Sequence, residues 1–269
     1  MLRGILRAAM LAALLWLAGR TEAAPPPTTL TVFAASSLQE PFEELAQRFE
    51  TAHPGVRVRL NLAGTPQMAA QLAQGADADV FASADEHWML DVQGQGRVNG
   101  TPEVFARNTL VLLVPRRNPA RIRDARDLAR RGVKVAVALE QVPVGRYTQE
   151  TLRRLAARPD FPADYLRRVR ANVVTEEENV KAVVAKVRLG EVDAGFAYRT
   201  DAVARYARTL TVLPIPLPDT AQVVARYPIA VVRTSRAAAL AQAFVDLVVG
   251  NEGQTVLMSH GFRPAAADR

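Results

Sequence analysis

From residue 30 onward, short apolar runs alternate with segments in which apolar residues recur every three or four positions. The short runs predict buried strands, and the spaced segments predict amphipathic helices with one apolar face. The predicted strands are 30–34, 56–62, 80–82, 109–114, 133–138, 172–174, 194–197, 210–213 and 229–232, and the predicted helices are 38–50, 66–74, 86–92, 147–156, 179–189, 201–206, 237–249 and 253–260.

The alternation of strands and helices predicts an α/β fold, in which mixed, mostly parallel sheets are covered by helices on both faces. Two short segments, 106–108 and 227–228, have the character of crossovers between domains. We therefore predict two Rossmann-like lobes joined by a two-strand hinge. A discontinuous lobe I would comprise residues 28–107 and 228–269, and lobe II would comprise residues 108–227.

Residues 1–24 have the pattern of a secretory signal peptide. Arg3 and Arg7 precede an apolar run from Ala8 to Ala18, and small residues follow up to Ala24. The run is shorter than the roughly 20 residues that cross a bilayer, so we predict cleavage and a periplasmic protein. Because the sequence contains no cysteine, we expect neither a lipidated cysteine nor a disulfide.

The charge is mildly basic and concentrated in one part of the chain. The formal net charge is +7, and arginines gather between residues 116 and 170, for example in the pairs 153–154 and 167–168. Their spacing relative to apolar residues predicts solvated outer faces of helices. Aromatic residues that could stack on bases are not interleaved with these arginines, so we expect no nucleic-acid site.

Several junctions between a strand and a helix carry small or hydroxyl residues. Ser37, Thr65, Ala84 and Val180 each lie near the start of a predicted helix. Helix N-termini present free N–H groups and a partial positive charge, so several of them around one cleft would bind an anion without lysine or arginine. Sheets of this kind also bind ligands beyond the carboxyl ends of their strands. The set therefore predicts an anion site.

Each junction also has a purely structural interpretation. Ser37 would be an N-cap, and with Glu40 three residues later it fits a capping box that merely stabilises a helix. Thr65 likewise fits an ordinary N-cap. Ala84 and Val180 carry little functional signal individually. Both interpretations stay open for Ser37 and Thr65, and only the set is informative.

Several sequence blocks resemble one known family. Residues 31–38 (TVFAASSL) and 75–85 (GADADVFASAD) closely resemble blocks of the periplasmic molybdate-binding proteins of ABC importers. Later blocks follow in the order found in that family, and together they cover essentially the whole mature chain. These later blocks are 106–112, 142–147, 178–180, 194–202, 227–228 and 261–264.

The resemblance implies a type II periplasmic binding protein that delivers molybdate or tungstate to a membrane permease without any cofactor. We expect it to be a monomer. At residues 64–66 the family often has serines, whereas this chain keeps one hydroxyl and has a proline without an amide N–H. Tyr198 would donate its phenol, although a tyrosine packed against the hinge is the structural alternative. The implied ligand-binding residues are Ser37, Thr65, Ala84, Val144, Val180 and Tyr198.

A pocket of donors favours a fully deprotonated dianion, because a hydroxyl on the ligand would face another donor. Hydrogen phosphate is therefore disfavoured. Sulfate has the same charge and shape as molybdate but is smaller, so it remains an alternative ligand, as does a small carboxylate. A carboxylate would call for an arginine clamp, for which Arg146 and Arg199 lie at the edges of the donor motifs.

An exported enzyme is the alternative from another class. Ser37 could be a nucleophile, and Asp79 or Asp85 could be an acid or base. However, the sequence has no Gly-x-Ser-x-Gly elbow, and no nucleophile can be paired with a base. The three histidines lie in unlike contexts without the spacing of zinc ligands. We therefore expect neither enzymatic activity nor a cation site.

Overall fold

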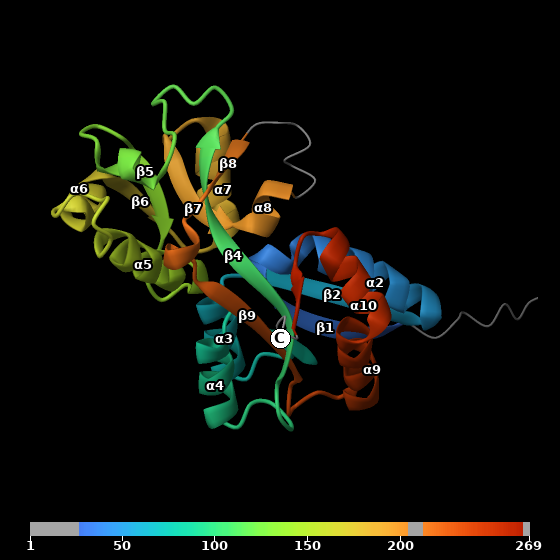
Figure 1. The fold of residues 1–269 in the computed structure, drawn as a ribbon. Coiled ribbons are helices and arrows are strands. Elements are labelled where there is room, and N and C mark those ends of the chain that lie inside the picture. The colour runs from blue at the N-terminus through green and yellow to red at the C-terminus, as the bar shows by residue number, and fades with distance from the viewer. Residues whose placement is uncertain (1–26, 204–211, 266–269) are drawn as a thin grey trace, which may run out of the picture.

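The computed structural model describes residues 27–203 and 212–265, which form two lobes (Figure 1). One lobe contains the first and the last described elements, and the middle of the chain builds the other. The fold is a mixed α/β type with parallel and antiparallel strand pairs, as the sequence predicts. The predicted signal peptide, residues 1–24, lies outside the described residues.

In lobe I the central strand is β1 (Thr28–Ala35), which pairs in parallel with β2 (Val56–Ala63) and with β3 (Val80–Ala82). The last six residues of β1 are buried, which explains its apolar run. The helices of this lobe are α2 (Gln39–Ala52), α3 (Thr65–Ala73), α4 (Glu86–Gly94), α9 (Ala238–Val249) and α10 (Asn251–Ser259).

In lobe II the central strand is β5 (Val135–Ala138), which pairs in parallel with β6 (Val173–Glu177) and with β7 (Ala194–Tyr198). All residues of β5 and β7 are buried, as expected of strands covered on both faces. The helices are α5 (Pro143–Ala156), α6 (Tyr165–Asn172), α7 (Val180–Leu189) and α8 (Arg199–Val203), with the short 3₁₀ helices η2 (Ala125–Ala129) and η4 (Asp219–Ala221).

Two long antiparallel strands run through both lobes (Figure 1). β4 (Glu103–Pro115) and β9 (Val224–Val231) pair with each other. β9 also pairs with β3 of lobe I, whereas β4 pairs with β7 and β8 (Val212–Pro216) of lobe II. The lobes therefore share one continuous strand order, β2-β1-β3-β9-β4-β7-β5-β6, and β10 (Arg263–Pro264) adds to β4.

The predicted crossovers lie inside these two strands, and the prediction that strands begin after them is wrong. Residues 106–108 belong to β4, and residues 227–228 belong to β9. Asn108 is buried and donates from Nδ2 to Thr200 Oγ1 at 2.8 Å. Within the strand its side-chain amide therefore has a hydrogen-bond partner and does not need an exposed loop. Opposite Pro228, which has no N–H to donate, β4 contains a register shift. The hinge is thus a pair of continuous strands.

Other differences from the predictions concern helix ends. α5 begins at Pro143, before the predicted start at residue 147, because a proline needs no hydrogen-bond partner at the first helical position. For α6 the sequence indicated only a helical face that exposes Arg167 and Arg168, without helix bounds. The predicted helix 201–206 and strand 210–213 fall partly on residues outside the described ranges.

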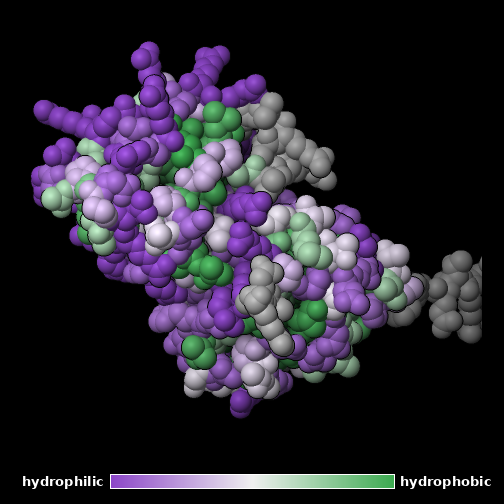
Figure 2. Space-filling model, in the orientation of Figure 1, coloured by the Kyte–Doolittle hydropathy of each residue, from purple (hydrophilic) through white to green (hydrophobic). Residues whose placement is uncertain are grey.

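The core and surface faces agree with the predicted pattern. The predicted apolar stripe, Leu38 just before α2 and Phe42, Leu45 and Phe49 within it, is buried, and α2 packs against β2, α9 and α10. The arginine pairs 153–154 and 167–168 are exposed on α5 and α6. Figure 2 shows hydrophilic residues over much of the upper lobe, so the concentration of arginine there is a solvated surface.

Candidate functional site

The six predicted ligand-binding residues lie around one cavity between the lobes. Three come from lobe I and three from lobe II. None of the six residues exposes more than 4 % of its surface. The residues that line it are Ala35, Ser36, Ser37, Ala63, Gly64, Thr65, Ala84, Val142, Pro143, Val144, Asn179, Val180 and Tyr198.

Ser37 is not the N-cap of a helix, contrary to the prediction. It lies in a one-turn 3₁₀ helix, η1 (Ser36–Leu38), and α2 begins after it at Gln39. The predicted capping box does not form, because the Glu40 carboxylate pairs with Lys181 instead. The Ser37 hydroxyl is buried and lies 3.2 Å from the Tyr227 hydroxyl. Since either hydroxyl can donate to the other, Ser37 can turn its proton toward a ligand.

Thr65 is also not an N-cap. Gly64 caps α3, and its N–H donates to Gln67 Oε1 at 3.0 Å, while Thr65 occupies the first helical position. Thr65 Oγ1 accepts from the Ala84 amide at 3.4 Å, a long and therefore weak hydrogen bond. The interpretation of Thr65 as an ordinary cap is wrong, and its hydroxyl instead connects two residues of the cavity wall.

Ala84 follows β3 and precedes Asp85, the N-cap of α4. Asp85 Oδ1 accepts from the Trp88 amide at 2.9 Å, and the same buried carboxylate forms an ion pair with Arg146 of lobe II. Burial raises the pKa of Asp85, and the Trp88 amide and the Arg146 charge oppose this change. Asp85 therefore contributes to helix capping and to contact between the lobes, in addition to fixing the position of Ala84.

In lobe II the N-termini of α5 and α7 line the cavity. Pro143 is the first residue of α5, so the first N–H of this helix belongs to Val144. Asn179 caps α7 by accepting from the Ala182 amide at 3.0 Å, and Val180 is the first helical residue. The amides of Val144 and Val180 lie in the first helical turn, where an N–H has no intrahelical partner. Both residues therefore line the cavity at the start of a helix.

Tyr198 ends β7 and carries a buried side-chain hydroxyl at the cavity. Its amide donates to Asp201 Oδ2 at 3.0 Å, and its ring packs against Tyr227 with the centroids 5.9 Å apart. Among the described residues the Tyr198 hydroxyl has no hydrogen-bond partner. Burial raises its pKa well above the usual value, so the hydroxyl keeps its proton and can donate. Packing against the hinge explains the ring, but it does not explain the hydroxyl.

The electrostatics of the cavity come from helix N-termini and neutral donors. Within the described residues neither lysine nor arginine lines it. Arg146 is engaged by Asp85, and Arg199 is exposed, so the arginine clamp that a carboxylate ligand would need is not assembled. The starts of α3, α5 and α7 all line the cavity, where their partial positive charges favour an anion.

Sequence reasoning missed the residues that join the lobes beside the cavity. Lys181 of α7 pairs with Glu40 of α2 at 3.0 Å, and Trp88 Nε1 of α4 donates to the Gln141 carbonyl at 2.8 Å. These partners are 141 and 53 positions apart in sequence, so local spacing cannot reveal them. The sequence did offer one signal for Lys181, because this residue directly follows Val180, a predicted ligand-binding residue.

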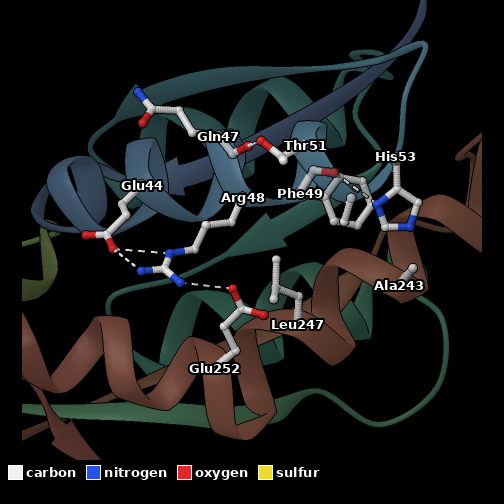
Figure 3. A pocket seen from close by; sticks show the side chains of 10 residues that line it. Glu44, Gln47, Arg48, Phe49, Thr51, His53, Ala243, Leu247 and Glu252 are labelled. Carbon is white, nitrogen blue, oxygen red and sulfur yellow. Dashed lines mark hydrogen bonds and ion pairs between the residues drawn. The ribbon is translucent and has the colours of Figure 1, made fainter.

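A second, more open hollow lies on lobe I between α2 and the helices α9 and α10 (Figure 3). Arg48 is held there between Glu44 and Glu252, at 2.8 and 3.0 Å. These carboxylates would repel a dianion, and none of the predicted site residues lines this hollow. Across the described ranges no group of three or more histidine, aspartate or glutamate residues is arranged to hold a metal ion.

Comparison with known proteins establishes the family. A family model described as bacterial extracellular solute-binding protein matches residues 30–263. The chain belongs to this family. The solute-binding protein is also 37% identical to the molybdate-binding protein ModA of Mycobacterium tuberculosis, over 265 residues that cover 96% of each chain.

Solved structures with the same fold include two other solute-binding proteins. The sulfate-binding protein SubI from Mycobacterium tuberculosis has a TM-score of 0.77 at 20% identity, covering 88% of this chain and 87% of its own. The periplasmic molybdate-binding protein of Azotobacter vinelandii has a TM-score of 0.73 at 21% identity, covering 87% of this chain and 98% of its own. The predicted type II periplasmic binding protein fold is confirmed. No helix in the described ranges is long and apolar enough to cross a membrane.

Proposed function

We propose that this solute-binding protein captures molybdate or tungstate as a dianion in the cavity between its lobes. The observation that carries the proposal is the buried Tyr198 hydroxyl, which lacks a partner among the described residues and lies on the same cavity as three helix N-termini. A buried donor without an acceptor costs about 1–3 kcal/mol, and an oxygen of the ion would supply the acceptor. The 37% identity to ModA of Mycobacterium tuberculosis favours molybdate among the oxyanions.

Because the proposed site offers only hydrogen-bond donors, it would select ligands by their protonation state. Neutral groups of six residues would donate to the ion, and a ligand that carries its own hydroxyl would place two donors against each other. Hydrogen phosphate should therefore bind weakly, whereas molybdate, tungstate and sulfate carry no proton at neutral pH. The proposed donors are the hydroxyls of Ser37, Thr65 and Tyr198, and the amides of Ser37, Thr65, Ala84, Val144 and Val180.

In this proposal the protein is a binding component that performs no chemical conversion and needs no cofactor. Residues 1–24 direct its export to the periplasm, and the monomer carries the ion to the permease of an ABC importer. Enclosure between two lobes that share a hinge suits this role, because closing changes the surface that a permease meets.

Sulfate is the second candidate ligand, since SubI from Mycobacterium tuberculosis has the same fold. Titration of the mature protein with molybdate, tungstate, sulfate and phosphate separates these possibilities. Trp88 is a suitable fluorescent reporter, because its indole donates to Gln141 across the lobes and the other tryptophan, Trp16, is in the predicted leader. Tight binding of molybdate and tungstate alone is expected. Equal affinity for sulfate would overturn the choice of ligand, and no response to any oxyanion would overturn the proposed class.

Replacement of Ser37 by alanine tests the role of a hydroxyl that caps no helix. We expect S37A to weaken molybdate binding about tenfold, the equivalent of about 1.4 kcal/mol, with little change in thermal stability. Calorimetric titration and thermal unfolding measure the two effects. S259A, which removes a hydroxyl bonded within α10, is the control. A loss of stability with unchanged affinity in S37A would show that the hydroxyl is structural.

A further inference from the structure

Outside the hinge strands β4 and β9, four polar contacts between described residues join the lobes around the cavity, and none of these four uses a proposed ligand donor. Two are hydrogen bonds, from Gln67 Nε2 to Glu178 Oε2 at 2.7 Å and from Trp88 Nε1 to the Gln141 carbonyl at 2.8 Å. The other two are ion pairs, Arg146 with Asp85 and Lys181 with Glu40. Separation of the lobes would break all four contacts.

Of the two ion pairs, the one formed by Lys181 has the more deeply buried cation. The Lys181 side chain is 21% exposed, compared with 31% for Arg146. Its Nζ lies 3.1 and 3.0 Å from the two carboxylate oxygens of Glu40 in the other lobe. It also lies 3.2 Å from Oδ1 of Asp201 in its own lobe. Burial alone would lower the pKa of Lys181, but the charges of Asp201 and Glu40 outweigh it and raise this pKa, so the amine stays charged.

Asp201 connects this cation to the cavity. Its second oxygen, Oδ2, accepts from the Tyr198 amide at 3.0 Å, and its side chain is almost completely buried. A contact path therefore runs from Glu40 of lobe I through Lys181 and Asp201 to Tyr198. Tyr198 carries the hydroxyl at the cavity that has no partner within the described residues.

We propose that Lys181 is a positioning residue that couples closure of the lobes to placement of the Tyr198 hydroxyl and thereby sets how long the ion is retained. This inference rests on the proposed capture of an oxyanion and adds the residue that governs its release. In the closed protein Lys181 holds Glu40 across the lobes and balances the charge of Asp201. Opening separates Glu40 from Lys181 and exposes the ion.

The path also predicts an order of severity among variants. Loss of Lys181 breaks the contact between lobes and leaves the Asp201 carboxylate unbalanced beside the site of a dianion, which is unfavourable. Loss of the Glu40 charge removes only the contact across the lobes. K181M should therefore release the ion faster than E40Q, and E40Q should add little when K181M is already present.

The test measures dissociation of molybdate by stopped flow, with Trp88 fluorescence as the signal. We expect K181M to dissociate about tenfold faster than wild type while its association rate changes by less than about twofold, because the pair forms after the ion has entered. K181R, which restores a cation, should recover most of the retention. K186M is the matched control, since Lys186 lies on the same helix and pairs with Glu191 within lobe II at 2.6 Å.

A second measurement needs no ion. Because the chain contains no native cysteine, Q47C on α2 and A185C on α7 give one spin-label pair that reports the separation of the lobes. K181M should lengthen this separation relative to K186M. Equal dissociation rates in K181M and K186M, or additive effects of E40Q and K181M, would overturn the proposal. If wild type binds no oxyanion, the proposed function fails, and equal spin-label distances in the two variants would then independently overturn the role of Lys181 in closure.

Discussion

At the scale of single residues, the hydroxyls at the candidate site are not the groups that cap the surrounding helices. Ser37 and Thr65 fit capping motifs in sequence, yet neither caps a helix in the structure. Asp85 and Asn179, in contrast, accept from helix amides next to the cavity and so stabilise the fold. The distinction matters because replacing a capping residue affects stability, whereas replacing a hydroxyl that caps no helix should affect binding.

Tyr198 gives the sharpest residue-scale prediction. In the ligand-free protein, Y198F removes a buried hydroxyl without a partner among the described residues, so we expect the free energy of unfolding to rise by about 1 kcal/mol. A hydrogen bond to a charged ligand contributes about 1.5–3 kcal/mol, so the affinity for molybdate should fall at least about tenfold. Chemical denaturation and calorimetric titration measure the two effects. Unchanged affinity would remove Tyr198 from the donor set.

Asp85 predicts a pH dependence of stability. Burial raises its pKa in the folded protein above the ordinary value of 3.8, so its ionisation costs folding free energy. D85N keeps a capping oxygen and cannot ionise. The stability of wild type relative to D85N should thus be greatest below pH 3.8 and fall as the pH rises through the folded pKa. The slope cannot exceed about 1.4 kcal/mol per pH unit, which is the limit for one proton. Urea unfolding at several pH values checks this, and a difference that grows with pH would contradict it.

At the scale of elements, the chain places several helix starts around one cavity, and close packing makes two glycines essential there. A Cβ on Gly64 would lie 2.4 Å from the Glu178 carbonyl oxygen of the other lobe. A Cβ on Gly145 would lie 2.0 Å from the Leu139 carbonyl oxygen within lobe II. Both distances are far below contact, but one obstructs closure and the other obstructs folding of a lobe.

Replacement by alanine should therefore affect ligand affinity at Gly64 and folding stability at Gly145. We expect G64A to keep its thermal stability within about 1 kcal/mol while molybdate affinity falls at least about tenfold, because its lobes cannot close fully. G145A should lose about 1–3 kcal/mol of folding stability through overpacking. Thermal unfolding and titration distinguish the two, and a destabilised G64A with normal affinity would show that its contact is not specific to closure.

Element types were largely predictable because burial and helical period are local properties of the sequence. The apolar run of β1 and the stripe of α2 are both found as predicted. Continuity of β4 through Asn108 was not predictable, because it depends on Thr200, a partner 92 positions away. For α6 the sequence indicated an exposed arginine face but not where the helix begins and ends, and in the structure α6 packs against η2.

The residues of the candidate site also fall into those that could be predicted from sequence and those that could not. Resemblance to a family supplied six of the residues that line the cavity, including Val144, whose helix was predicted to start too late. The contacts between lobes could not be predicted, because residues such as Lys181 and Glu40 meet only after both lobes have folded. Sequence motifs thus locate residues of the cavity wall, whereas the contacts between the lobes are a property of the folded chain.

At the scale of the whole molecule, the two lobes are parts of one sheet system rather than separately hinged domains. β4 and β9 pair along most of the length of β9, and each continues into the sheet of a lobe. Movement of the lobes must bend or twist these strands without breaking their ladder. This arrangement permits opening at the cavity while the register between β4 and β9 is kept.

Shared strands also predict cooperative unfolding. Because neither lobe sheet is complete without β4 or β9, we expect a single calorimetric transition whose van't Hoff and calorimetric enthalpies agree. Molybdate at about 100 times its dissociation constant should stabilise the protein by about 2.7 kcal/mol and shift this one transition upward. Two resolved transitions, with only one responding to the ion, would contradict the shared-sheet description.

The position of β9 near the end of the chain fixes an order of assembly. β3 pairs with β1 on one side, and its other side is occupied by β9, whose first residue is Val224. During synthesis the sheet of lobe I therefore keeps an unpaired edge until all of lobe II has been made.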